Sequence, residues 1–267
     1  MIGDPALALT TAAIVISAVM VATWLVSVAL KNASIVDVVW GLGFVGVAWA
    51  VRLRVDGDSA RQNLLVAMTT VWGLRLAGHL FWRNHVALAT NKGEDYRYRA
   101  MRKRWGPRFP LISLVTVFVV QGVLMSIVSL PVQLGQTADT PSVGALAWIG
   151  VALWLFGLFF EVVGDAQLTR FRRDPASAGT VMDKGLWRYT RHPNYFGDAC
   201  VWWGIAIVAA ETSVGRWGLA GALVMTLLLR RVSGVTLLEK SLVKRRAGYA
   251  EYVARTSPFV PRPPKRA

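Results

Sequence analysis

Long apolar segments alternate with short polar connections along most of the chain. Most of these segments approach the roughly 20 residues that an α-helix needs to cross the hydrocarbon core of a bilayer, whereas the second and the last two are shorter. The pattern predicts an all-α fold, a polytopic membrane bundle of about seven transmembrane helices. The predicted segments are residues 6–30, 36–53, 62–82, 110–134, 143–164, 195–210 and 217–231.

The composition supports the same class of protein. Of the 267 residues, 54% are hydrophobic and 17% are charged, whereas soluble domains have about 25% charged residues. The single cysteine, Cys200, excludes a disulfide framework and a thiolate zinc site. The chain has three histidines and no pair of them at ligand spacing, so a metal site is not expected either.

The net charge of +15 would suit a nucleic-acid-binding protein, so the positions of the basic residues decide what it means. Most of the 30 Lys and Arg residues occur in the regions that a topology with an outside N-terminus places inside. These regions are the connection at Lys31, the two long loops 83–109 and 165–194, and the segment after residue 229. Basic loops of membrane proteins lie on the cytoplasmic side. This asymmetry predicts an outside N-terminus and an inside C-terminus, and it explains the charge without a nucleic-acid partner.

Ionisable side chains inside membrane-spanning segments are costly, so each is a candidate functional group. Asp37 opens the second segment in "SIVDVVWGLGF". The alternative to a functional role is that Asp37 is the acid of a capping box, three residues after an N-cap at Ser34. Arg75 and His79 lie four residues apart and share a helix face. An ion pair between Arg75 and a carboxylate would equally suit a structural role, and a lone bundle histidine is more often packed than catalytic.

The inner loop after the fifth segment combines several kinds of polar group next to the membrane. Glu161 and Asp165 share a helix face at the inner end of the fifth segment, where this loop begins. Residues 165–198 carry basic, aromatic and amide side chains. Arginine matches phosphate oxygens, aromatic faces stack on a base, and Asn or Asp can hold ribose hydroxyls. Binding of lipid headgroups, the alternative, would need only the charge. The mixture favours a nucleotide cofactor, and a Rossmann fold is not expected.

The sequence "RHPNYFGD" (191–198), followed by an aromatic apolar helix, resembles the C-terminal signature of the steroid 5α-reductase and sterol reductase superfamily. The closing residues 237–261 resemble the cytosolic end of that family. The resemblance covers about 161–261, and residues 1–267 are expected to form a single membrane domain with a basic tail at 258–267. The upstream "DAQLTRFRRDP" is similar to a sterol reductase element, in step with it at Gln167, Phe171, Arg172, Asp174 and Pro175.

The resemblance implies an NADPH-dependent membrane reductase that saturates a carbon–carbon double bond in a lipid. Leu168 stands where the motif has a lysine, which leaves the preference for NADPH over NADH open. By match to the motifs, the residues that line the cofactor would be Arg172, Arg191, His192, Asn194, Tyr195 and Asp198, with Asp165 and Arg231 as companions.

Hydride addition needs a double bond polarised by a conjugated carbonyl or by protonation, so the protein must supply an acid. The candidates, in order, are Asp37, then Tyr96 or Tyr98 in "GEDYRYR", and then His79. Both tyrosines would alternatively be ordinary interfacial aromatics. The glutamate–tyrosine pair of the steroid 5α-reductases has no clear match, although Asp37 could stand for the glutamate. A steroid enone, a polyprenyl chain or an unsaturated fatty acyl group would suit an apolar cavity.

Isoprenylcysteine carboxyl methyltransferases and phospholipid methyltransferases carry a similar R-H-P-x-Y-x-G element, and they give the alternative function. Their C-terminal pattern resembles Glu239, Leu242, Tyr249 and Tyr252 here, and the implied ligand would be S-adenosylmethionine. The spacing of Asn194 and Asp198, the additional upstream element and the larger number of spans favour the reductase. The basic composition, rich in alanine, valine and arginine, predicts a bacterial inner membrane as the location.

Overall fold

The computed structural model describes residues 3–84, 93–138, 143–232, 239, 246 and 248–265. In these residues every regular element is a helix, and the β contact is an isolated bridge between Thr190 and Ser257. The predicted all-α fold is confirmed. Within the same residues, five helical stretches are long and apolar enough to cross a membrane: α1 (Pro5–Ala29), α2 (Ile35–Arg54), α3 (Ser59–Trp82), Tyr96–Val128 and α8 (Ala145–Arg173).

The last two predicted segments are also helical but are not among these five. α9 (Pro193–Ala210) begins with polar residues, and α10 (Leu219–Leu227) has only 9 residues before the π-helix η8 (Leu228–Val232). The stretch Tyr96–Val128 is itself divided. Its parts are α4 (Tyr96–Trp105), η3 (Gly106–Arg108), α5 (Phe109–Ser113), the π-helix η4 (Leu114–Val119) and α6 (Val120–Val128), after which α7 (Leu130–Leu134) follows. The number of seven spans and the orientation stay predictions.

The chain forms two compact units. Unit 1 consists of Met1–Trp148 and Ile205–Gly221, and unit 2 consists of Ile149–Gly204 and Ala222–Ala267. The boundaries fall inside α8, α9 and α10, so these helices contribute to both units. All four candidate acids belong to unit 1, and all eight candidate cofactor residues belong to unit 2.

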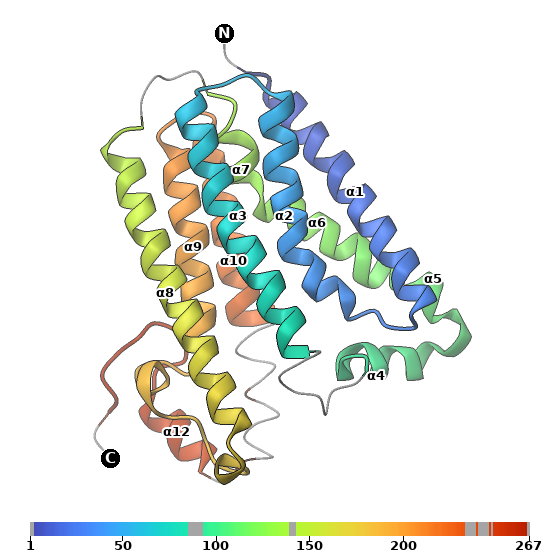
Figure 1. Ribbon diagram of the computed structural model, residues 1–267, viewed down its shortest axis with the longest axis vertical. Coiled ribbons are helices and arrows are strands. Elements are labelled where there is room, and N and C mark those ends of the chain that lie inside the picture. The colour runs from blue at the N-terminus through green and yellow to red at the C-terminus, as the bar shows by residue number, and fades with distance from the viewer. Residues whose placement is uncertain are drawn as a thin grey trace. The chain divides into compact units, whose positions relative to one another are not determined.

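In unit 1, α1, α2 and α3 lie side by side (Figure 1), and glycines bring the backbones of α2 and α3 into contact. A Cβ added at Gly41 would lie 2.4 Å from the carbonyl oxygen of Gly73. The stretch "GLGFVG" (41–46) has the glycine spacing of a dinucleotide-binding motif, but it lies within α2, with no strand before it. Gly41 therefore serves helix packing. Next to this crossing, the buried rings of Phe44 and Trp72 meet edge to face at 5.5 Å.

One end of unit 1 gathers the connections that the sequence places outside the membrane. The Gly3 N–H donates to the Thr137 carbonyl at 2.9 Å, and the Asp58 N–H donates to the Ala138 carbonyl at 2.8 Å. The N-terminus, the loop between α2 and α3 and the segment after α7 are thereby joined. The predicted topology requires these three connections to share one side.

A buried ion pair closes the same end of unit 1. Arg61, 1% exposed, donates from Nη2 to Glu211 Oε2 at 3.2 Å. Glu211 also accepts from the backbone N–H groups of Gly144 and Ala147, where α8 begins. Burial alone would raise the pKa of Glu211, but these hydrogen bonds and Arg61 lower it overall. The carboxylate thus replaces an N-cap side chain for α8.

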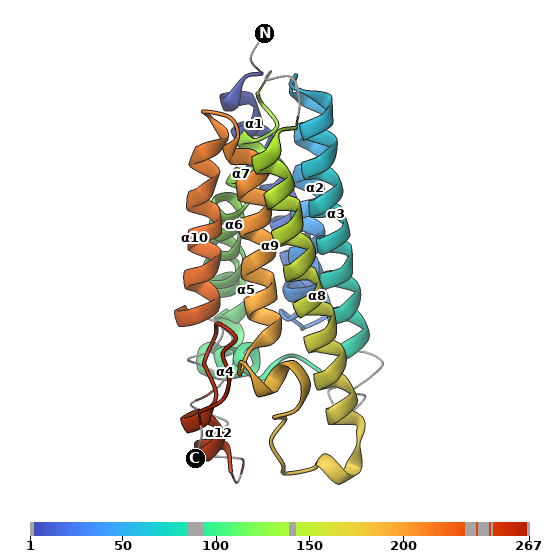
Figure 2. The ribbon, with the colours of Figure 1, turned by 90° about the vertical axis from the view of Figure 1, so that its left-hand side faces the viewer.

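In unit 2, α8 and α9 pack along a seam of glycines spaced seven residues apart, and Figure 2 shows the two helices side by side. A Cβ at Gly157 would lie 2.6 Å from the carbonyl oxygen of Gly197, and a Cβ at Gly204 would lie 2.6 Å from that of Gly150. Seven residues are close to two helical turns, so these glycines recur on one face of each helix. Small residues at this spacing let transmembrane helices approach closely.

Replacing Gly157 with alanine is expected to destabilise unit 2 by roughly 1–3 kcal/mol, because the new methyl group must push the two backbones apart. Gly78→Ala in α3 is the matched control, since no atom lies within 4 Å of a Cβ there and alanine favours a helix over glycine by about 1 kcal/mol. Thermal unfolding in detergent measures both. Equal melting temperatures for the two variants would contradict the close seam.

Candidate functional site

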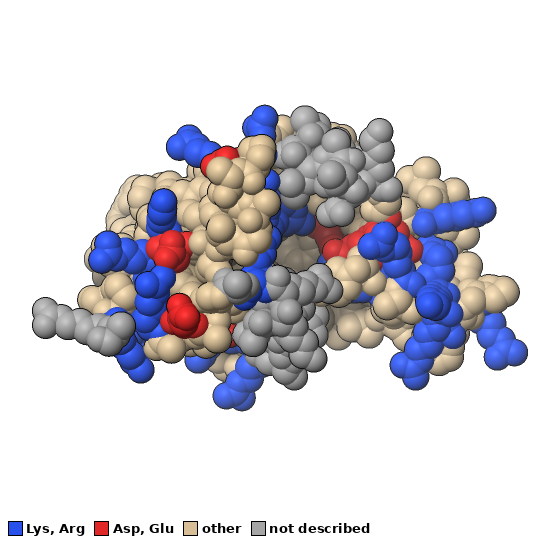
Figure 3. Space-filling view, turned by 90° about the horizontal axis from the view of Figure 1, so that it is seen from below, with Lys and Arg blue, Asp and Glu red and all other residues tan. Residues whose placement is uncertain are grey.

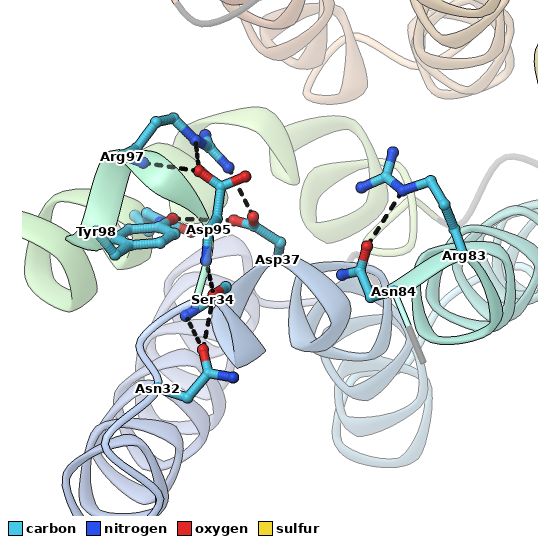
Figure 4. Close-up of polar contacts among 9 residues, drawn as sticks. Asn32, Ser34, Asp37, Arg83, Asn84, Asp95, Arg97 and Tyr98 are labelled. Carbon is cyan, nitrogen blue, oxygen red and sulfur yellow. Dashed lines mark hydrogen bonds and ion pairs between the residues drawn. The ribbon is translucent and has the colours of Figure 1, made fainter. Parts of the chain in front are cut away.

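The first cluster of candidate residues lies where the α1–α2 connection meets the start of α4. The Asp95 N–H donates to Ser34 Oγ at 2.7 Å, and Ser34 Oγ donates to Asn32 Oδ1 at 2.7 Å (Figure 4). Ser34 is the N-cap of α2 but makes no side-chain capping bond, so the capping box is not formed. Asp37 is therefore not the acid of a capping box.

Two side chains of α4 converge on the carboxylate of Asp37 (Figure 4). Arg97 Nη2 donates to Asp37 Oδ2 at 2.7 Å, and the Tyr98 hydroxyl donates to Asp37 Oδ1 at 2.9 Å. Gln121 Nε2 donates to the same hydroxyl oxygen at 3.3 Å. The hydroxyl of Tyr98 is thus held between one acceptor and one donor, with the Arg97 guanidinium 5.2 Å from its ring centroid.

Gln121 reaches this cluster from the second residue after the π-helix η4 (Leu114–Val119). A π-helical turn takes one more residue than an α-helical turn, so it rotates the side chains that follow around the helix axis. Such single turns are frequent at functional sites. η4 therefore helps to set the helix face on which Gln121 lies.

Of the four candidate acids, the structure brings Asp37 and Tyr98 into contact. Tyr98 is 5% exposed, whereas Tyr96 is 51% exposed on the outer side of α4. His79 lies in the last turn of α3, one turn after Arg75, and both side chains are half-buried. Among the candidate acids, Asp37 and Tyr98 thus form a hydrogen-bonded pair.

A second ion pair fixes α4 beside this site. Glu94, 8% exposed, accepts from Nε and Nη2 of Arg102 at 2.9 Å and from the Ala33 N–H at 2.8 Å. Burial alone would raise the pKa of Glu94, but the hydrogen bonds from Arg102 and Ala33 lower it overall. Sequence reasoning does not single out Glu94, Arg97 or Gln121. Glu94 and Arg97 could have been found from the sequence, because two acids directly precede a basic helix there.

In unit 2, Arg191 of "RHPNYFGD" is buried and holds the C-terminal segment. Its Nε and Nη2 donate to the carboxylate of Glu239 at 2.7 and 3.0 Å. Its Nη1 donates to the backbone carbonyls of Val253 and Thr256 at either end of the last turn of α12 (Tyr249–Arg255). The sequence motif and the end of the chain are thereby linked through one guanidinium.

Glu239 also contacts the next residue of the motif. His192 Nε2 lies 3.1 Å from Glu239 Oε1, and the His192 ring stacks on Tyr195 at 5.4 Å with a 3° angle between the planes. Burial would raise the pKa of Glu239, but the contacts with His192 and Arg191 lower it overall.

The lowered pKa of Glu239 makes unit 2 sensitive to acid. Because the folded-state pKa lies below the ordinary value of 4.5, the contribution of this carboxylate is present above that pH and is lost as the pH falls through the folded-state pKa. Glu239→Gln is expected to lower stability at neutral pH and to reduce its further loss below pH 4.5. Thermal unfolding across this range, with exposed Glu251→Gln as the control, measures the effect. Parallel pH curves for wild type and Glu239→Gln would contradict it.

The remaining polar candidates lie on α8, α9 and η8. Asn194 Nδ2 donates to Asp165 Oδ1 at 3.0 Å, which joins the two helices. One turn further into each helix are Glu161 and Asp198, 3% and 8% exposed. Arg172, near the end of α8, and Arg231, in the π-helix η8, are exposed. Buried carboxyl groups, a half-buried amide and exposed guanidinium groups thus occur in one unit.

Comparison with known proteins relates the chain to one family and to two other proteins. A family model described as a protein of unknown function (DUF1295) matches residues 23–256. An uncharacterized protein of Schizosaccharomyces pombe is 24% identical over 269 residues, which is 90% of this chain and 75% of the relative. The 3-oxo-5-alpha-steroid 4-dehydrogenase 1 of Bos taurus is 32% identical over 71 residues, 27% of each chain. No solved structure matches.

Proposed function

This chain belongs to the DUF1295 family, the steroid 5α-reductase-like group, and on that premise we propose that it reduces an activated carbon–carbon double bond of a lipid. The observation that carries the proposal is the contact between Tyr98 and Asp37, 2.9 Å apart in a mostly apolar unit. A steroid enone, a polyprenyl group or a fatty acyl group with a conjugated carbonyl would be the substrate. The proposed location is a bacterial inner membrane.

Tyr98 is the proposed proton donor. A carbonyl conjugated to the double bond accepts hydride at its β-carbon only when its oxygen is stabilised by a hydrogen bond or a proton. Rotation about the Cζ–Oη bond turns the hydroxyl hydrogen of Tyr98 from Asp37 towards such an oxygen. Gln121 holds the hydroxyl oxygen in place, and the positive charge of Arg97 offsets the negative charge that remains on the phenol. Asp37 is then a positioning residue that orients both α4 side chains.

The side chains of unit 2 fit the chemistry of NADPH. Carboxylates and an amide can bind ribose hydroxyls and a carboxamide, which suits Asp165, Asn194 and Asp198. Arg172 and Arg231 are exposed cations that suit the phosphates. When bound, NADPH would supply the hydride. Arg191 and His192 both contact Glu239, and Tyr195 stacks on the His192 ring, so these three side chains would hold the motif in place.

Binding experiments test the cofactor. Calorimetry with NADPH, NADH and S-adenosylmethionine on the same detergent-solubilised protein is expected to show binding of a nicotinamide dinucleotide. Arg172→Ala and Asn194→Ala should each weaken it about tenfold or more, because a hydrogen bond to a charged group contributes roughly 1.5–3 kcal/mol.

Arg188→Ala is the matched control, since Arg188 is also an exposed arginine of unit 2. Binding of S-adenosylmethionine alone would overturn the reductase and favour the methyltransferase. Unchanged NADPH affinity in both variants would overturn the assignment of these two residues.

A further inference from the structure

The outer face of α4 is basic and aromatic. The helix has the sequence YRYRAMRKRW, and its exposed positions recur at spacings of three and four residues, as expected for one helix face. The members of this face are Tyr96, Arg99, Ala100, Lys103 and Arg104. Arg108, in the turn after the helix, is exposed as well.

The basic residues of α4 fall into two groups. Arg97 and Arg102 face the bundle and pair with Asp37, Asp95 and Glu94. In contrast, no carboxylate of the described chain forms an ion pair with Arg99, Lys103, Arg104 or Arg108. Figure 3 shows this end of unit 1 with the acidic groups set inward and basic side chains projecting around them. The outer group therefore presents a concentrated positive charge that no ion pair among the described residues neutralises.

The position of α4 indicates whether this charge faces water, lipid headgroups or acyl chains. Figure 1 shows α4 running across the direction of α2, and Gly106, with φ 51°, ends the helix before the chain turns into the next span. Leu111, one turn beyond Arg108, is 71% exposed, as expected for a side chain that faces acyl chains. Trp105, 40% exposed, is the last residue of α4, and the Arg104 guanidinium lies 5.3 Å from its ring centroid. Tryptophan and arginine together are typical of the headgroup layer.

We propose that the outer basic face of α4 (Arg99, Lys103, Arg104 and Arg108) binds the headgroups of anionic phospholipids. Clusters of four or more basic residues directly beside a membrane span attract anionic lipids, each contributing about 1 kcal/mol. Tryptophan is enriched at the headgroup level, so the contact of Arg104 with the Trp105 ring would hold its guanidinium near the lipid phosphates. This binding does not depend on the reductase function, because none of these four residues belongs to the acid cluster or to unit 2.

Native mass spectrometry of the full-length protein, titrated in detergent with phosphatidylglycerol or phosphatidylcholine, tests the proposal. Wild type is expected to bind phosphatidylglycerol in preference to phosphatidylcholine. The variant R99Q/K103Q/R104Q/R108Q should bind phosphatidylglycerol at least tenfold more weakly, since about 1 kcal/mol per charge corresponds to roughly fivefold for each residue. The matched control, R54Q/K184Q/R188Q/R216Q, removes four exposed charges elsewhere and should keep wild-type binding.

Three results would overturn the proposal: no preference for phosphatidylglycerol in wild type, equal losses in the two variants, or unchanged binding in the α4 variant. All eight replaced side chains are exposed, so both variants are expected to fold. Thermal unfolding in lipid-free detergent checks this. NADPH affinity, measured on the same samples, should be unchanged in the α4 variant.

Discussion

Tyr98→Phe is expected to lower turnover by roughly 10²–10⁴, the usual contribution of a positioned general acid. Phenylalanine keeps the ring, which is 5% exposed, and removes only the hydroxyl that Asp37 and Gln121 hold. The variant should therefore fold and bind NADPH as wild type does. The measurement is single-turnover oxidation of NADPH with an enone lipid, together with the NADPH dissociation constant.

Tyr96→Phe is the matched control for this variant. This variant also removes a tyrosine hydroxyl, two residues away from Tyr98 and from a side chain that is 51% exposed. Near-normal turnover is therefore expected. Similar activity in the two variants would contradict the role of Tyr98, whether both are active or both are inactive. The remaining candidates His79 and Asp37 would then be tested in its place.

Asp37→Asn separates the two members of the pair. The asparagine oxygen can still accept from the Tyr98 hydroxyl, but Arg97 loses its contact at 2.7 Å with a charged partner. Turnover should therefore fall less than in Tyr98→Phe, and thermal stability should fall as well. If Asp37→Asn abolishes turnover at full stability while Tyr98→Phe remains active, Asp37 is the proton donor and the proposed assignment is reversed.

Arg191→Ala is expected to destabilise unit 2 by roughly 3–5 kcal/mol, the usual effect of removing one partner from a buried ion pair. The side chain of Glu239 is 17% exposed, and among the described residues its remaining ion pair would be the one with His192. The carbonyls of Val253 and Thr256 would also lose a donor. Thermal unfolding and limited proteolysis of the C-terminal segment measure the change.

Arg172→Ala is the counterpart to Arg191→Ala. Arg172 is exposed near the end of α8, so its replacement should leave the melting temperature nearly unchanged and weaken NADPH binding. If Arg191→Ala instead keeps full stability and loses only NADPH, the guanidinium acts on the cofactor and the clamp on the C-terminal segment is dispensable. Arg172 and Arg191 would then both act in cofactor binding.

Much of the fold follows from local features of the sequence. Apolar runs predict α1, α2, α3 and α8 because burial of a helix in lipid depends mainly on the length and composition of the segment itself. The motif at 191–198 predicts where unit 2 concentrates its polar groups, because its residues are neighbours in the chain. The close packing of α8 on α9 is harder to predict from the sequence, because glycines spaced by seven residues predict a contact face but do not identify the partner helix.

The contacts at the candidate site depend on tertiary structure. Asp37 and Tyr98 are separated by 61 residues, and their contact requires α4 to lie across the end of α2, in a position that the ion pair of Glu94 with Arg102 fixes. Glu239 meets Arg191 across 48 residues in the same way. Hydropathy and spacing report on the environment of each residue separately. By itself, therefore, the sequence determined the helices, the membrane class and the polar motif, and only the tertiary structure decided which acid meets which base, because that depends on how distant segments pack.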